Sequence, residues 1–212
     1  MKGCPVNALF LVDLQNDFLP GGALAVPAAD EVIPVANRLM ERFDLVVAAQ
    51  DWHPPGHESF ASSHPGRRPG DVIELHGLQQ ILWPDHCVRE TPGAELAGGL
   101  RVERIDKIIR KGTDPRIDSY SGFFDNAHRK ATGLADFLQE RGAGELYVMG
   151  LATDYCVKFT ALDARQLGLT TYVIEDGCRG VDLTPGDVAA AIRAVKEAGA
   201  VVLNSGQILH AD

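Results

Sequence analysis

The fold is decided by residues 146–156, which read LYVMGLATDYC. Residues 146–149 form a short, mainly apolar run, which is typical of a buried strand. A glycine follows at position 150, and residues 154–166 then have the pattern of a helix that Gly168 ends. A strand followed directly by a helix is the alternation found in α/β proteins with a parallel sheet.

Short apolar runs alternate with helical patterns along the rest of the chain. We expect strands at 8–12, 45–49, 105–109, 146–149, 170–174 and 201–203, and helices at 30–42, 132–141, 154–166 and 185–198. This order predicts an α/β fold with a doubly wound, mostly parallel six-stranded sheet and helices on both of its faces.

The regular pattern fails over residues 51–101, which are rich in Pro, Gly and His. Loops of this length in compact domains are usually functional or disordered. The aromatic residues Trp52, Phe60 and Trp83 argue against disorder here. We therefore expect a single domain over 1–212, with a loop-rich insertion at about 51–101 that binds a metal or a substrate.

Charge and hydropathy exclude several classes of partner. The chain has 212 residues and a formal net charge of -9. Nucleic-acid binding depends on Lys and Arg that neutralise phosphates, and anionic membranes also attract basic proteins. The first apolar run, 8–12, is too short to span a bilayer, and no signal-peptide pattern is present. We expect a cytoplasmic protein that binds a small molecule and neither nucleic acid nor membrane, and a homo-oligomer is compatible with the sequence.

Side chains capable of catalysis follow the ends of the expected strands. Asp13 follows the first strand, Asp51 the second, Lys111 the third, and the fourth leads into Cys156. In doubly wound sheets, ligands bind beyond the carboxyl ends of the strands. These four residues are therefore expected to converge at one edge of the sheet.

Cys156 is the candidate nucleophile. It lies in the first turn of an expected helix, where backbone N–H groups and the helix dipole favour a thiolate and can hold an oxyanion. The alternative is a small buried hydrophobe. The other cysteines, Cys4, Cys87 and Cys178, are widely spaced and are expected to stay reduced. They have no predicted role beyond packing.

Asp13 and Lys111 are the candidate partners of this thiol. Asp13 follows a run of apolar residues, where a carboxylate is costly to bury unless it is paired. It would take the thiol proton and deliver it to a leaving group, with Lys111 keeping it ionised. The alternatives are a turn-forming aspartate and a solvated lysine.

A divalent-metal site is expected at Asp51 and His53. Residues two apart on an extended segment point the same way, and Asp with His suits zinc, iron(II) or manganese. His86 is the best third ligand, and His57 and His64 compete with it.

Motifs along nearly the whole chain resemble, in the family's order, those of the nicotinamidases, which are isochorismatase-like cysteine hydrolases. They are LVDLQNDF (11–18), GGAL (21–24), QDWHP (50–54), WPDHC (83–87), KG (111–112), DSYSGF (118–123), GLATDYCV (150–157) and DGCRG (176–180). Each motif alone is weak, but the set is specific.

The resemblance implies catalytic roles. Cys156 would be the nucleophile, Asp13 the general acid/base and Lys111 the third catalytic residue. The family also implies a non-proline cis peptide bond between Ala152 and Thr153, with the amides of Ala152 and Cys156 directed at the oxyanion. The reaction implied is deamidation of nicotinamide to nicotinic acid and ammonia through a thioester, as part of NAD salvage.

The resemblance also implies the metal and ring contacts. Asp51, His53 and His86 would hold one divalent ion, zinc or iron(II) before manganese, with Ser59 reaching its shell through water. His57 does not have the spacing of the additional histidine ligand of some nicotinamidases, so it stays outside the ligand set. The residues that match ring-contacting positions of the family are Phe18, Trp83 and Tyr120.

Two alternatives stay open. One is a related amidase of the same superfamily that acts on another small carboxamide. The other is a non-catalytic metal- or ligand-binding protein of the same fold. The Asp51-Trp52-His53 motif together with WPDHC (83–87) favours the metal-dependent nicotinamidase branch.

Overall fold

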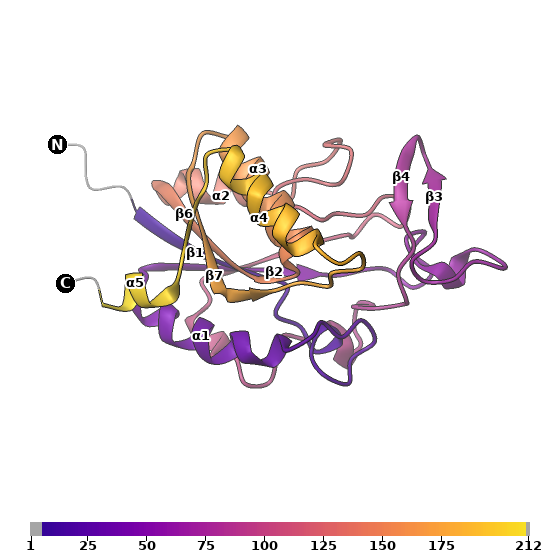
Figure 1. The fold of residues 1–212 in the computed structure, drawn as a ribbon, viewed down its shortest axis with the longest axis horizontal. Helices are drawn as coiled ribbons and strands as arrows, with labels where there is room; N and C mark the ends of the chain where they lie inside the picture. Colours follow the sequence, from indigo (N-terminus) through magenta and orange to yellow (C-terminus); the bar gives the residue numbers. More distant parts are fainter. Residues whose placement is uncertain (1–5, 211–212) are drawn as a thin grey trace.

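Figure 1 shows a computed structural model of the chain, which describes residues 6–210. Six strands form the main sheet: β1 (Val6–Val12), β2 (Leu45–Asp51), β5 (Lys107–Lys111), β6 (Ala143–Leu151), β7 (Thr170–Arg179) and β8 (Val201–Leu203). Their order is β5-β2-β1-β6-β7-β8, and every neighbouring pair is parallel. The predicted fold class is therefore confirmed.

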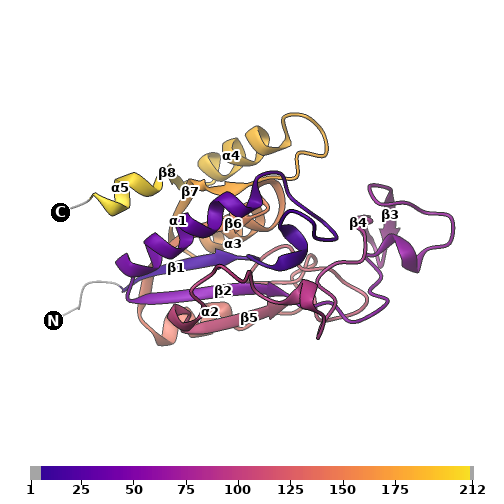
Figure 2. The same cartoon turned by 90° about the horizontal axis from the view of Figure 1, so that it is seen from below.

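The helices cover both faces of the sheet, as expected. One face carries α1 (Val32–Leu39) and α5 (Ser205–Leu209), and the opposite face carries α2 (Leu134–Glu140), α3 (Lys158–Gln166) and α4 (Asp187–Glu197), as Figures 1 and 2 show. No helix within residues 6–210 has both the length and the apolar character needed to cross a bilayer.

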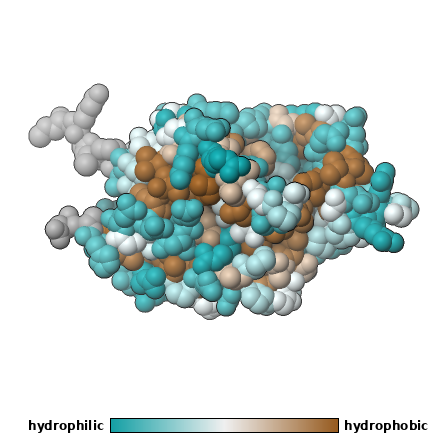
Figure 3. Space-filling view, in the orientation of Figure 1, coloured by the Kyte–Doolittle hydropathy of each residue, from teal (hydrophilic) through white to brown (hydrophobic). Residues whose placement is uncertain are grey.

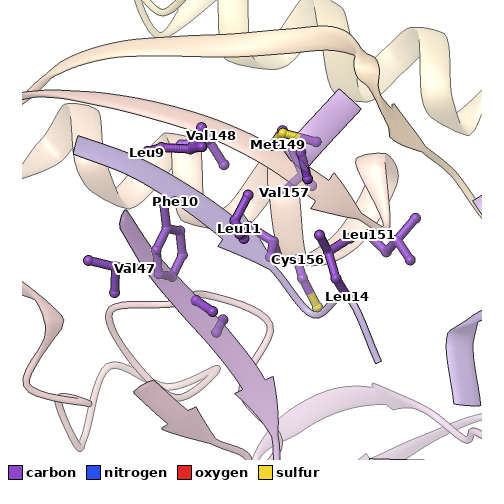
Figure 4. Packing of buried hydrophobic residues seen from close by; sticks show 14 of the residues in the cluster. Leu9, Phe10, Leu11, Leu14, Val47, Val148, Met149, Leu151, Cys156 and Val157 are labelled. Atoms are coloured by element: carbon purple, nitrogen blue, oxygen red, sulfur yellow. The ribbon is translucent and has the colours of Figure 1, made fainter. Parts of the chain in front are cut away.

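The core lies around strands β1 and β2. All seven residues of β2 are buried, because helices or loops cover both faces of the sheet. In Figure 4, Leu9 of β1 lies beside Val148 of β6, Phe10 lies beside Val47 of β2, and Cys156 lies near the end of this cluster. The core thus extends up to the candidate nucleophile. The face of the molecule seen in Figure 3 is largely hydrophilic, with hydrophobic areas between the hydrophilic ones.

The insertion at 51–101 holds a hairpin that the sequence pattern did not predict. Strands β3 (Val72–Leu75) and β4 (Leu78–Ile81) pair antiparallel, and Figure 1 shows them standing away from the main sheet. Their turn is His76-Gly77, and both residues have positive φ, which suits a two-residue hairpin. The strands have only four residues each and leave much of their surface exposed, so the hydrophobic signal was weak.

Two further helical segments differ from the expectation. The helix predicted at 154–166 begins as one π-helical turn, Thr153–Val157, and continues as α3. Single π turns inside helices are common at functional sites. The short helix α5, which carries a capping box at Asn204 and Gln207, was not predicted.

Gly150 brings the ends of β1 and β6 together. It pairs in register with Val12, and a Cβ atom at this position would lie 2.2 Å from the Val12 carbonyl oxygen. Only glycine fits this approach. Asp13, which follows with φ of 50°, therefore lies beside the chain that leads from β6 into Cys156.

Candidate active site

The ammonium group of Lys111, at the end of β5, contacts the other catalytic candidates. Asp13 follows β1, Asp51 ends β2, and Cys156 lies in the turn after β6. Its Nζ atom lies 2.9 Å from Asp13 Oδ2 and 2.6 Å from Asp51 Oδ1. It also lies 3.4 Å from Cys156 Sγ and donates to the Ser119 carbonyl oxygen at 2.9 Å. Lys111 is only 2% exposed. The convergence expected from the strand ends is therefore present. The side chain of Lys111 is buried, so the alternative of a solvated lysine is excluded.

Burial and charge together set the protonation states. Burial favours a neutral Lys111, but the adjacent carboxylates Asp13 and Asp51 outweigh it, so the pKa of Lys111 is raised well above its usual value. Burial raises the pKa of Asp13 to about 7, although the charge of Lys111 opposes this shift. Asp13 thus has the pKa of a useful acid/base at neutral pH.

The Cys156 thiol is protonated in the resting site. Burial raises its pKa well above the usual value, and Lys111 offsets this only in part because Asp13 and Asp51 act in the opposite direction. Burial and the adjacent carboxylates therefore oppose the thiolate that the helix terminus was expected to favour. A base must remove the proton, and Asp13 is the adjacent candidate.

The position of the cis peptide bond expected from the sequence was wrong by one residue. The non-proline cis bond joins Leu151 to Ala152 and not Ala152 to Thr153. Strand β6 continues through Leu151 and the π-helical turn starts at Thr153, so the chain changes direction where the strand ends. The Ala152 carbonyl accepts hydrogen bonds from the N–H groups of Tyr155 and Val157, which ties this turn to the segment that carries Cys156.

Asp51, His53 and His86 form a cluster that fits a divalent ion. Their ligand atoms lie within 4.8 Å of one another, and the Nε2 atoms of His53 and His86 are 3.8 and 3.9 Å from Asp51 Oδ2. His53 Nδ1 donates to the Gly112 carbonyl at 2.9 Å and His86 Nδ1 donates to the Pro84 carbonyl at 2.8 Å. Both Nε2 atoms are therefore unprotonated in the neutral rings and available as ligands.

The same conclusion follows from burial. His53 Nε2 is buried without a hydrogen-bond partner in the described part of the chain, which a metal ion would remedy. Burial lowers the pKa of both His53 and His86, so the rings stay neutral at neutral pH. The two carboxylate oxygens of Asp51 have different partners. Oδ1 contacts Lys111, and Oδ2 faces the imidazole rings of His53 and His86.

The other candidate ligands make hydrogen bonds of their own, although His57 Nε2 also lacks a partner among the described residues. His57 Nδ1 accepts from the Ser59 N–H at 3.1 Å and lies 2.8 Å from Ser59 Oγ, and His64 Nε2 donates to the Glu58 carbonyl at 2.7 Å. A second group of potential ligand atoms, Asp13, Asp51 and Cys156, also lies within 4.8 Å. The Lys111 ammonium contacts all three, so that group repels a cation.

Comparison with known proteins assigns the chain to a family. Residues 7–207 match the isochorismatase domain family. The chain is also 53% identical over 202 residues to the nicotinamidase of Escherichia coli strain K12, a match that covers 93% of this chain and 94% of the relative. The chain belongs to the nicotinamidases of the isochorismatase family.

Solved structures of nicotinamidase relatives have the same fold. A nicotinamidase/pyrazinamidase of Acinetobacter baumanii matches with a TM-score of 0.94 and 46% identity, over 98% of this chain and 100% of that one. The pyrazinamidase of Pyrococcus horikoshii, in complex with zinc, matches with a TM-score of 0.76 and 37% identity, over 94% of this chain and 99% of that one. The family resemblance drawn from the motifs is confirmed.

A cavity in this nicotinamidase-family chain joins the thiol to the metal cluster. Asp51, His86 and Cys156 line it, and so do the three aromatic residues expected to contact a ring: Phe18, Trp83 and Tyr120. Sequence reasoning missed several lining residues, namely Leu24, Val26, Asp118, Tyr155 and Val181. Leu24, Asp118 and Tyr155 lie inside the motifs quoted above, and their place in those motifs could have identified them as candidate site residues.

Gly112→Ala is expected to weaken metal binding by the nicotinamidase at least tenfold. A Cβ atom on Gly112 would lie 2.4 Å from His53 Cε1, so the ring must shift from its position beside Asp51. Displaced ligand support typically costs 10–100-fold in affinity. Gly142→Ala is the control, since Gly142 has a similar φ of +69° but open space around it. Zinc titration of both variants measures the effect. Equal zinc affinities would show that the position of the His53 ring does not depend on the space that Gly112 leaves beside it.

Proposed function

We propose that the protein is a metal-dependent nicotinamidase that hydrolyses nicotinamide to nicotinic acid and ammonia. The observation that carries the proposal is the position of Lys111 Nζ, in contact with Asp13, Asp51 and Cys156 beside an aromatic-walled cavity. This arrangement supplies a nucleophile, a proton carrier and a cation within one buried site.

The chain's own residues account for the proton transfers. As Cys156 Sγ attacks the carboxamide carbon, Asp13 accepts the thiol proton. Asp13 then gives this proton to the departing nitrogen, the C–N bond breaks, and ammonia leaves a thioester on Cys156. Asp13 next takes a proton from water as its oxygen attacks the thioester carbon. The C–S bond breaks to release nicotinic acid, and Asp13 returns the proton to Cys156 Sγ. Lys111 keeps Asp13 oriented through both halves, and the Ala152 and Cys156 amides are the proposed donors to the oxyanion.

Asp51, His53 and His86 would hold the divalent ion, with Ser59 reaching its shell through water. When bound, the ion supplies a Lewis-acidic centre for the pyridine nitrogen and so fixes the ring relative to Cys156. Two imidazoles and a carboxylate suit zinc, iron(II) or manganese, and the zinc complex of the Pyrococcus horikoshii relative supports zinc.

The aromatic residues are proposed to hold the flat ring. Phe18 packs beside the ligand His86 with ring centroids 5.6 Å apart. Trp83 meets Tyr155 edge-on at 4.9 Å and donates its indole N–H to the Tyr120 hydroxyl at 3.0 Å. These contacts fix the walls before substrate binds, which favours a small planar ligand.

In this proposal the insertion at 51–101 supplies the metal site and one wall of the substrate cavity, because the three metal ligands and Trp83 all lie within it. A role in NAD salvage, which the family resemblance implies, is part of the same proposal. The cytoplasmic location and a homo-oligomeric state stay predictions.

The kcat/KM for nicotinamide is expected to fall about tenfold per pH unit below pH 7. Asp13 acts as a base only when ionised, and burial raises its pKa to about 7, so the active fraction falls as pH drops below this value. Because the pKa of the Cys156 thiol lies well above its usual value, we expect a plateau from about pH 7 upward. Initial rates on metal-saturated enzyme measure this, and a flat profile down to pH 5 would exclude Asp13 as the base.

Ammonia release from nicotinamide, before and after chelation, tests the proposal. We expect chelation to abolish release and added zinc, iron(II) or manganese to restore it. His86→Ala should bind metal weakly, whereas His64→Ala, whose ring bonds to the Glu58 carbonyl, should resemble wild type. Release that survives complete metal removal would leave an amidase without metal dependence. No release with any metal would favour the alternative carboxamides.

A further inference from the structure

Asp118 is a buried carboxylate to which the sequence motifs gave no role. It is 4% exposed and lines the substrate cavity with Asp51, His86 and Cys156. A buried charge is costly unless hydrogen bonds or an opposite charge compensate it. The partners of Asp118 therefore indicate its purpose.

One carboxylate oxygen of Asp118 is left without a good partner. Oδ1 accepts the Ser119 N–H at 2.7 Å, whereas the contact of Oδ2 is Gln80 Nε2 at 3.4 Å, beyond the ordinary range for such bonds. The Gln80 amide lies closer to the Ile81 carbonyl at 2.7 Å and to the Tyr120 hydroxyl at 3.1 Å. Since an amide has two N–H donors, these nearer acceptors use both, and Oδ2 keeps free acceptor capacity.

Asp118 also lies close to the proposed metal ligands. It lines the same cavity as two of them, Asp51 and His86. The carboxylate is therefore within electrostatic reach of the metal cluster and of the cavity at once.

The charges around the cavity favour a divalent cation. Three buried carboxylates, Asp13, Asp51 and Asp118, surround the site, and Lys111 is the cation that contacts two of them. With all four groups ionised, the excess of negative charge equals the charge of a divalent ion. Lys111 forms ion pairs with Asp13 and Asp51. Within residues 6–210, no ion pair joins Lys111 to the third carboxylate, Asp118.

We propose that Asp118 is a positioning residue for the metal shell, whose Oδ2 accepts a hydrogen bond from water on the ion held by Asp51, His53 and His86. This inference rests on the proposed metal site. Three protein ligands leave coordination positions for water, and water on a cation is a strong donor that needs an acceptor. Groups that support a metal site in this way contribute about 10–100-fold to its affinity.

Asp118→Asn tests the inference, because it keeps the shape of the side chain and an acceptor for Ser119 while it removes the charge. We expect its zinc affinity, measured by competition with a chelator, to fall 10–100-fold. The absorption spectrum of bound Co²⁺ should also change, which a purely structural role of Asp118 would not produce. Asp118→Ser gives the same measurements if the asparagine variant does not fold.

Asp163→Asn is the matched control. Asp163 is 5% exposed on α3, its Oδ2 lacks a hydrogen-bond partner in the described chain, and it does not line the substrate cavity. Its variant should keep wild-type zinc affinity and Co²⁺ absorption.

Three outcomes would overturn the inference. If Asp118→Asn binds zinc within twofold of wild type, the metal site stands and Asp118 has no part in it; a raised KM alone would then indicate substrate contact. Equal weakening in Asp163→Asn would indicate a general effect of losing a buried carboxylate. If wild type itself binds no divalent ion, the proposed metal site fails together with the inference.

Discussion

Cys156→Ala should abolish nicotinamide hydrolysis and leave metal binding unchanged. Loss of an attacking nucleophile typically lowers kcat by at least about 10⁴-fold. No other thiol can replace it among the described residues. Cys178 Sγ donates to the Ile174 carbonyl at 3.2 Å, and Cys87 is buried with a pKa raised well above the usual value by burial.

Metal affinity is the informative part of this experiment. Cys156 belongs to the second group of potential ligand atoms, with Asp13 and Asp51. If Lys111 excludes a cation from that group, the variant binds zinc as wild type does. Weaker zinc binding would mean that the thiolate is itself a ligand.

Ammonia release and zinc titration, with Cys87→Ala as the control, give both readouts for the Cys156 variant. In wild type, hydroxylamine should trap the acyl group as a hydroxamate, and in Cys156→Ala no hydroxamate should form. Turnover above about 1% of wild type in the variant would contradict the thioester mechanism, since the expected loss is at least about 10⁴-fold.

The sequence predicted those parts of the fold that depend on a single local pattern. The run 8–12 is apolar without interruption, as a strand covered on both faces must be, and β1 includes it. The sequence also places Asp13, Asp51 and Lys111 after strand ends, and parallel pairing then brings them together. Strand order itself did not have to be known for this conclusion.

Features that depend on distant contacts could not be predicted in this way. The hairpin of β3 and β4 has little apolar surface of its own. The protonated state of Cys156 results from burial and from carboxylates on β2 and after β1, which outweigh the local helix terminus. Asp118 was part of a recognised motif, but its free oxygen becomes visible only when the competing acceptors of Gln80 are known.

Lys111→Met should lower both the activity and the stability of the protein. The methionine keeps an unbranched apolar side chain but leaves Asp13 and Asp51 buried without their cation, and breaking such a buried pair typically costs about 3–5 kcal/mol. The charge of Lys111 is what holds the pKa of Asp13 down against burial. Without it the pKa rises above 7, Asp13 stays protonated at neutral pH, and kcat should fall by about 10²–10⁴-fold, the contribution of a general base.

The loss of stability in Lys111→Met should depend on pH in a defined direction. Where the folded pKa of a carboxyl exceeds its unfolded value, the folded state binds more protons, so stability increases as pH falls towards the unfolded value. The deficit relative to wild type should therefore be largest at pH 8 and shrink towards pH 5, in urea unfolding of the metal-free proteins. Lys107→Met, an exposed position on the same strand β5, should stay within about 0.5 kcal/mol of wild type at each pH. Adding Asp13→Asn to Lys111→Met should recover stability at pH 8 but not activity. A deficit independent of pH would mean that Lys111 acts through packing and not through its charge.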